Sequence, residues 1–355
     1  MASTRWRAEA SVAILFAVVL LIVAGGAVWF GPRMYVHEDP STVPSTPADA
    51  PKDTYARPVE ASRQLARALV VGDRLPGLSV AVAVNGEIAW AEGFGWSGAD
   101  RRTPLTPQAR FRLGALSKPV TAIAAARLHD QRQLDLDVPV QRYVPAYPEK
   151  TWTVTTRQLL GDLAGVHRIR GDNNDAMPTN HCESLDEAVA MLAGEPLGMT
   201  RTVVSEADAL DDGPAYASRK LFGLPAGVKE ARRPDYSCLA GAGAFLSTPT
   251  DLVRLGSAML KPGPLKAETI AAFQTPGRLA SGGATTYALG WTVTTVQLAG
   301  APVRMVSHRG SPMGGSVSLL IFPDLGLTIA AAANASGTAG VDPFARQVAE
   351  AFTRQ

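Results

Sequence analysis

Residues 111–122 read FRLGALSKPVTA, and they predict the start of a helix around Lys118. Lys118 is followed by an apolar, alanine-rich run that is typical of a helix. Pro119 fits this helix only if the helix begins near residue 115, because the N–H groups of a first turn have no acceptor within the helix. Ala115 then lies one turn before Lys118, on the same face of the helix.

Ala115 and Lys118 have the spacing of an S-x-x-K motif from which the serine is missing. In that motif the serine three residues before the lysine is the nucleophile, and the lysine shares its proton. The methyl group of Ala115 cannot attack a carbonyl. Ser117 is the nearest other hydroxyl, but consecutive helical residues point about 100° apart, so it would not face Lys118 across one turn. We therefore expect Ser117 to be a first-turn hydroxyl rather than a nucleophile.

The segments around this helix predict a folded body over residues 59–355. Residues 59–76 have the apolar spacing of an amphipathic helix, and residues 78–95 predict a hairpin around Asn85-Gly86. Strand-like runs return in the last quarter, before a final helix at 342–355. This order predicts an α/β (α+β) fold, an antiparallel sheet flanked by the N- and C-terminal helices with a helical subdomain. We expect the two terminal helices on one face of the sheet, and Lys118 and His308 to meet at its edge.

The N-terminus predicts a membrane protein with a single pass. Residues 11–30 contain no charge, and 20 residues suffice to cross a hydrocarbon core of roughly 30 Å as a helix. Arg5 and Arg7 precede this anchor and only Arg33 closely follows it, which favours a cytoplasmic segment 1–10 and an extracytoplasmic body. A cleaved signal peptide is the alternative, because residues 24–27 are small.

Residues 31–58 are expected to form a tether between the anchor and the body. Their prolines stand among serine, threonine and acidic residues, a composition that does not bury enough apolar surface to order itself.

Composition argues against several other classes of protein. The formal charge is only +2, with Arg and Lys spread along the chain, so no nucleic-acid partner is expected. The five histidines form no H-x-H or H-E-x-x-H, and we expect no metal and no cofactor. Residues 172–175, DNND, are interpreted as a solvated turn.

Cys182 and Cys238 would be able to pair in an oxidising compartment, or they are two free thiols. Nothing in the sequence indicates an oligomeric state.

Six segments occur in a characteristic order along the chain. They are FRLGALSKPVTA, LDLDVPVQRYVPAYPEKTWTVTTRQLLGDLAGVHR, EPLGMTRT, GAGAFLSTPTDLVRLGSAML, YALGW and SHRGSPMGGSVSLLIFPDLGLTIAAAAN. Any one segment alone would be a weak signal, but together they resemble the serine β-lactamase and penicillin-binding-protein-like hydrolases, a class C-like family. The resemblance is greatest to the branch that includes mitochondrial serine β-lactamase-like proteins, and it runs from about residue 60 to 350.

The resemblance implies hydrolysis of an amide or ester through an acyl-enzyme, with Lys118 and His308 as the catalytic residues. His308, Arg309 and Gly310 match the family's third motif, which faces the nucleophile. Arg309 replaces a hydroxyl residue there and adds a fixed charge suited to carboxylates. The backbone N–H groups of Ala115 and Ser311 would bind a carbonyl oxygen or carboxylate.

Two departures from the family pattern predict impaired catalysis. Ala115 replaces the nucleophile. The family's Tyr motif is expected before the PLGM segment at 196–199, but LDEAVAMLAGEPLGMT runs straight into PLGM. Tyr216 and Tyr236 lie after that segment, and we expect them to be structural.

Two functions therefore follow from the sequence. The first is a membrane-anchored, catalytically impaired member of the hydrolase family, with a small-molecule or peptide acyl substrate. The alternative is a non-catalytic protein of the cell envelope that binds a ligand or a partner. The missing Tyr segment also predicts apolar faces without a partner in the helical subdomain.

Overall fold

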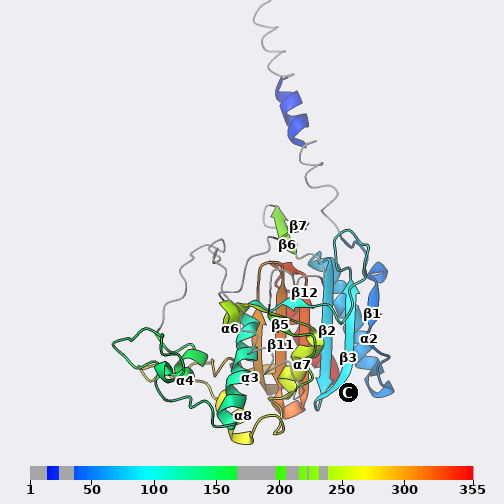
Figure 1. Cartoon of the computed structure of the whole chain (residues 1–355). Helices are drawn as coiled ribbons and strands as arrows, with labels where there is room; N and C mark the ends of the chain where they lie inside the picture. Colours follow the sequence, from blue (N-terminus) through cyan, green and yellow to red (C-terminus); the bar gives the residue numbers. More distant parts are fainter. Residues whose placement is uncertain are drawn as a thin grey trace, which may run out of the picture.

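The computed structural model describes residues 14–23, 36–165, 197–204, 216–221, 224–231 and 239–354. Its centre is a seven-stranded antiparallel sheet of strand order β1-β3-β2-β12-β11-β10-β9 (Figure 1). The strands are β1 (Ser45–Pro47), β2 (Gly77–Val84), β3 (Glu87–Gly95), β9 (Thr292–Leu298), β10 (Ala301–Gly310), β11 (Ser316–Phe322) and β12 (Leu327–Ala333).

The hairpin predicted around Asn85-Gly86 is confirmed as the β2–β3 pair. Asn85 has φ 54° and Gly86 has φ 90°, the left-handed conformations that a tight two-residue hairpin turn requires. Strand β2 also pairs with β12, which joins the N-terminal part of the body to the C-terminal part. The antiparallel sheet expected from the order of segments is therefore confirmed.

Both faces of the sheet are buried, and the strands alternate between two cores. On β11, Leu319 and Ile321 belong to one apolar cluster, while Leu320 and Phe322 belong to the other. This follows from the two-residue period of a strand, which sends successive side chains to opposite faces. The fold therefore has three layers, with helices on each side of the sheet.

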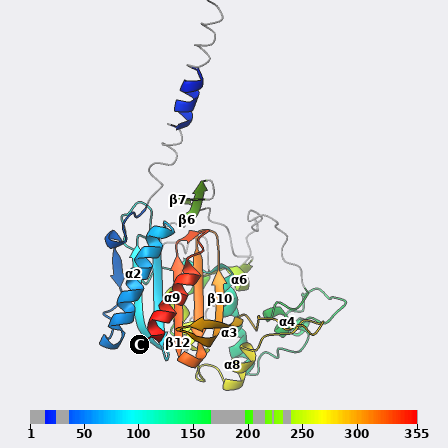
Figure 2. The same cartoon turned by 180° about the vertical axis from the view of Figure 1, so that it is seen from behind.

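The terminal helices α2 (Ala56–Gly72) and α9 (Val341–Thr353) cover one face, as predicted (Figure 2). Val59 and Val70 of α2 and Phe344 and Val348 of α9 are buried in the same cluster. These residues recur at the spacing that places side chains on one side of a helix.

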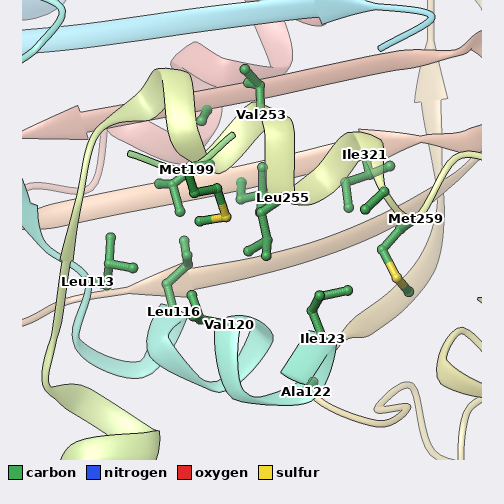
Figure 3. Close-up of a cluster of buried hydrophobic side chains, with 14 of the residues drawn as sticks. Leu113, Leu116, Val120, Ala122, Ile123, Met199, Val253, Leu255, Met259 and Ile321 are labelled. Atoms are coloured by element: carbon green, nitrogen blue, oxygen red, sulfur yellow. The ribbon is translucent and has the colours of Figure 1, made fainter. Parts of the chain in front are cut away.

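Helices α3 (Ser117–Asp130), α7 (Pro249–Ser257) and α8 (Ala267–Phe273) contribute to the other core. Figure 3 shows Leu116, Val120 and Ile123 pointing from the α3 side toward Leu255 and Met259. Because α3 is fixed by this packing, its first turn has a defined place beside the sheet.

Smaller elements complete the described chain. Two further sheets of three strands have the orders β13-β6-β7 and β4-β8-β5. The remaining elements are η2 (Pro40–Thr42), η3 (Asp53–Tyr55), β4 (Phe111–Arg112), η4 (Gly114–Leu116), η5 (Val140–Arg142), α4 (Thr156–Leu160), β5 (Val203–Val204), β6 (Tyr216–Leu221), β7 (Leu224–Glu230), α6 (Ala240–Gly243), β8 (Phe245–Ser247), η7 (Pro323–Leu325) and β13 (Ala335–Ser336).

The structure differs from the expected tether over residues 36–58, which lie against the body. Strand β1 pairs with β3 at the edge of the main sheet, and Val36 and Val43 are buried. His37 Nε2 lies 3.2 Å from the Pro76 carbonyl oxygen. The expectation that this segment would not order was wrong here, because the open edge of β3 offers backbone partners and an edge strand tolerates proline.

Residues 14–23 are helical with exposed apolar side chains. Across the ranges described, no helix is both long enough and apolar enough to cross a membrane. Several residues singled out in the sequence lie outside the described residues. These are the remainder of 11–30, residues 31–35, the DNND stretch, Cys182, Pro196, Tyr236 and Cys238.

Candidate active site

The position of the missing serine lies on a short 3-10 turn, η4, directly before α3. Gly114 opens this turn with φ 51°, a left-handed conformation that glycine adopts without strain. The Leu113 N–H donates to the Phe245 carbonyl oxygen over 2.9 Å, which ties the turn to β8. Ala115 is exposed at the tip of the turn, while Leu116 on its other side is buried.

Ser117 faces away from the site, into the protein. It is 0% exposed, and its Oγ accepts a hydrogen bond from the Phe245 N–H over 3.2 Å. A hydroxyl so placed joins α3 to β8 and does not meet solvent or a ligand. The expectation of a structural first-turn hydroxyl therefore agrees with the geometry.

The end of β10 approaches the η4 turn closely, and glycine makes this possible. A Cβ atom on Gly310 would overlap the Leu113 carbonyl oxygen and would lie 3.2 Å from the Leu116 nitrogen. A Cβ atom on Gly114 would in turn lie 3.0 Å from the Pro312 nitrogen. Ser311 follows Gly310 at this junction and is exposed. The segment from His308 to Ser311 therefore faces the turn that carries Ala115.

Lys118 forms an ion pair that the sequence did not predict. Its Nζ lies 2.7 Å from Asp162 Oδ2, and the two side chains are 28% and 51% exposed. Asp162 lies just past the end of α4, which begins with a capping box between Thr155 and Gln158. The pair joins the helical subdomain to the first turn of α3.

The backbone of Asp162 adopts a left-handed conformation, with φ 55°. The Asp162 N–H donates to the Leu159 carbonyl oxygen over 3.2 Å, and the Leu163 N–H donates to the Gln158 carbonyl oxygen over 2.8 Å. These bonds form a Schellman motif, whose left-handed position is usually a glycine. An aspartate at this position costs about 1 kcal/mol of local conformational free energy, which its side-chain contacts have to offset.

Tyr287, from the YALGW segment, connects Lys118 with His308. Its ring centroid lies 5.7 Å from Lys118 Nζ, and its hydroxyl lies 3.2 Å from His308 Nε2. Burial raises the pKa of Tyr287 well above its ordinary value, and the negative charge of Asp162 adds to the shift. The phenol is therefore protonated and is a hydrogen-bond donor at neutral pH.

His308 is a neutral imidazole at neutral pH. Its pKa is lowered to about 4, chiefly by burial and to a smaller extent by the charges of Lys118 and Arg309, while the Arg309 carbonyl and the Asp162 charge oppose the shift. Its Nδ1 lies 2.8 Å from the Arg309 carbonyl oxygen, which can only accept, so Nδ1 carries the proton. Nε2 is left to accept the hydrogen bond from the Tyr287 hydroxyl.

The structure thus brings Lys118, His308, Ala115 and the Arg309–Ser311 segment together, and it adds Asp162 and Tyr287. Tyr287 and Asp162 were noted in the sequence only as parts of matching segments, and neither was singled out as a site residue. Tyr216 is structural, since it is buried and its hydroxyl accepts a hydrogen bond from the Ala99 N–H over 2.7 Å. Cys182 and Cys238 lie outside the described residues.

A family model described as beta-lactamase matches residues 62–195 and 178–352. The chain is similar to the serine beta-lactamase-like protein LACTB, mitochondrial, of Homo sapiens, with 38% identity over 134 residues, 36% of this chain and 24% of that protein. It is also similar to the protein flp of Staphylococcus aureus strain N315, with 26% identity over 127 residues, 35% of this chain and 25% of that protein. The matched part therefore spans about a quarter of these curated relatives.

Solved structures show the same fold. A penicillin-binding protein homologue from Pyrococcus abyssi superposes with a TM-score of 0.65 and 20% identity, over 83% of this chain and 77% of that one. A class C beta-lactamase from Rhodobacter sphaeroides gives a TM-score of 0.60 and 18% identity, over 83% of this chain and 99% of that one. At these identities the likeness shows the fold alone.

Proposed function

This chain belongs to the beta-lactamase family, and we propose on that premise that it binds an acyl ligand in the family's site without forming an acyl-enzyme. The ligand class is a small molecule or peptide that presents a carbonyl oxygen or a carboxylate. The family reaction, hydrolysis of an amide or ester through a covalent acyl intermediate, would be impaired in this chain.

The observation that carries the proposal is the surface of the η4 turn. The exposed residue one turn before Lys118 is Ala115, which has no nucleophilic atom. The nearest hydroxyl in the sequence, that of Ser117, is fully buried and hydrogen-bonded to the Phe245 N–H. The turn therefore keeps the position of the nucleophile without its chemistry.

Backbone and side-chain groups at this junction support binding. Ala115 and Ser311 are both exposed, and within the described chain neither N–H has a hydrogen-bond partner. Two such donors would bind a carbonyl oxygen or carboxylate, as the oxyanion hole of an acyl-transfer enzyme does. The exposed guanidinium of Arg309 adds a charge that matches a carboxylate.

The polar pair behind the turn is poorly suited to activate a nucleophile. The Tyr287 hydroxyl is protonated and faces the neutral His308 ring. Lys118 Nζ donates to Asp162 Oδ2, so the amine is engaged with a carboxylate instead of being directed at the position of a nucleophile. General acid-base assistance is typically worth 10²- to 10⁴-fold in rate, so these arrangements add to the loss caused by Ala115.

We also propose that residues 11–30 anchor the chain in a membrane, with the body on the extracytoplasmic side. The support is the uncharged length of this segment together with Arg5 and Arg7 before it. An anchored chain should stay in the membrane pellet after a carbonate wash. Release of a soluble, shortened chain would instead indicate a cleaved signal peptide.

Calorimetric titration of the full-length protein tests the binding proposal. The probe is N-acetyl-D-alanyl-D-alanine, a small acyl peptide with one carboxylate. We expect saturable binding, and we expect Arg309→Ala to weaken it about tenfold, since a hydrogen bond to a charged group is typically worth about 1.5–3 kcal/mol. Arg346→Ala, which removes an exposed guanidinium on α9, is the matched control and should leave binding unchanged. Equal binding by all three proteins, or none by the wild type, would contradict the proposal.

A further inference from the structure

The ammonium of Lys118 is already held by a carboxylate of its own chain. Asp162 Oδ2 lies 2.7 Å from Lys118 Nζ, within the range of a charge-assisted hydrogen bond. In the ranges that the structure describes, Asp162 is the one carboxylate at ion-pair distance from this amine. A ligand carboxylate that binds the same amine would have to compete with Asp162.

The position of Asp162 is set by the end of α4 and not by the ion pair alone. The Schellman hydrogen bonds at Leu159 and Gln158 fix its backbone at a left-handed φ of 55°, directly after the last turn of α4. Its side chain is 51% exposed, so rotation of the carboxylate into solvent needs no movement of the backbone. The backbone of Asp162 is therefore fixed, while its carboxylate is able to leave Lys118.

The other groups around Lys118 do not replace this carboxylate. Tyr287 presents its ring at 5.7 Å from Nζ, and its hydroxyl is directed to His308. His308 is neutral at neutral pH. With Asp162 displaced, the ammonium would be free to bind an anion from outside.

We propose that Asp162 is a latch on Lys118. The Asp162 carboxylate is paired with the Lys118 ammonium in the ligand-free protein, and an anionic ligand binds Lys118 only by displacing this carboxylate. This inference rests on the proposed function for its ligand, but the ion pair itself can be tested without one. Asp162 acts through Lys118 and is a positioning residue.

Asp162→Asn is the variant that tests the latch. Asparagine is the residue found at the left-handed position of a helix end after glycine, so the backbone is retained while the charge is lost. We expect N-acetyl-D-alanyl-D-alanine to bind about two- to fivefold more tightly to this variant, the range that a partly exposed ion pair supports. The C-terminal amide of the same peptide, which has no carboxylate, should show no gain. Given that the acid binds, an equal gain for acid and amide, or an affinity of Asp162→Asn for the acid equal to that of the wild type, would refute the latch.

Asp137→Asn is the matched control. Asp137 pairs with Arg157 of α4, with Oδ1 2.6 Å from Nε, so this variant removes a carboxylate from the same subdomain without touching Lys118. It should leave the binding of both peptides unchanged. If Asp137→Asn bound the acid more tightly by the same factor as Asp162→Asn, the effect would be explained by net charge alone. That result would contradict a specific role of Asp162.

Amine labelling measures the latch without a ligand. Trinitrobenzenesulfonate reacts with the free amine, and peptide mass spectrometry gives the rate at Lys118 relative to the exposed Lys150 and Lys261. We expect this relative rate to rise about threefold in Asp162→Asn and to stay constant in Asp137→Asn, in line with the modest strength of such a pair. No change at Lys118 in Asp162→Asn would overturn the latch. Faster labelling without peptide binding by any variant would support the latch and defeat the proposed function.

Discussion

Replacement of Ser117 with alanine should destabilise the protein without changing its chemistry. The Ser117 hydroxyl is fully buried and accepts the Phe245 N–H over 3.2 Å. The Phe245 carbonyl oxygen accepts the Leu113 N–H over 2.9 Å, so β8 is tied to both sides of the η4 turn. Alanine would remove one of these two hydrogen bonds and leave the Phe245 N–H without this acceptor.

The magnitude of the loss follows from the burial of that N–H. A buried donor left without a partner costs about 1–3 kcal/mol, and the length of this hydrogen bond favours the lower half of that range. Alanine has a higher helix propensity than serine, which offsets at most about 0.5 kcal/mol of this loss in stability. We therefore expect the free energy of unfolding to fall by about 1–1.5 kcal/mol.

Urea unfolding of the full-length protein in a non-ionic detergent would measure this change. Ser257→Ala is the control, because the Ser257 hydroxyl donates to the Val253 carbonyl oxygen within α7 over 2.6 Å and its loss frees no buried N–H. That variant should stay within about 0.5 kcal/mol of the wild type. The structural role would be refuted if Ser117→Ala were as stable as the wild type. It would also be refuted if a serine-directed reagent labelled the wild-type protein but not Ser117→Ala.

Three further predictions concern the site. Ala115→Ser should be acylated only slowly by benzylpenicillin in a mass-spectrometric time course, and adding Asp162→Asn should speed it, since base assistance is typically worth 10²- to 10⁴-fold; equal rates in both variants would contradict this. The pKa of His308 is about 4 in the folded protein, below its ordinary 6.5, so the unfolded state binds more protons between these values and stability should fall as the pH is lowered from 6.5 to 4. His308→Gln should remove that part of the slope, on the order of 1–3 kcal/mol between pH 6.5 and 4, and a denaturation series with an unchanged slope would disprove it. Gly310→Ala should destabilise by more than about 2 kcal/mol because its methyl group would overlap the Leu113 carbonyl, whereas Gly263→Ala, with no atom within 4 Å of the added Cβ, should be near neutral in thermal unfolding.

The parts of the fold that sequence predicted depend on local signals. Asn85-Gly86 supports its own hairpin, and the apolar spacing of the terminal helices defines their buried faces. The expectation that Ser117 is a structural first-turn hydroxyl followed from helical geometry at Lys118, but its burial against β8 was not predicted. Residues 36–58 were mispredicted because composition does not reveal that β3 offers them an open edge.

The candidate site was predicted only in part, because half of it depends on tertiary contacts. Lys118 and His308 were found from spacing and from the resemblance to a family. Asp162 and Tyr287 join them only when α4 and the YALGW segment fold against α3, which the Gly290 N–H supports by donating to the Leu160 carbonyl oxygen over 2.9 Å. No local pattern predicts which side chains such a junction brings together.

The most direct test of binding without acylation is the intact mass of the wild-type chain. The protein would be incubated with benzylpenicillin and with an activated ester, beside Ala115→Ser as the variant that regains a hydroxyl. We predict that the wild-type mass stays unshifted with both reagents, while Ala115→Ser slowly gains the mass of the acyl group. A covalent adduct on the wild-type chain, mapped to Ser117 or to any other residue of the site, would contradict the proposal.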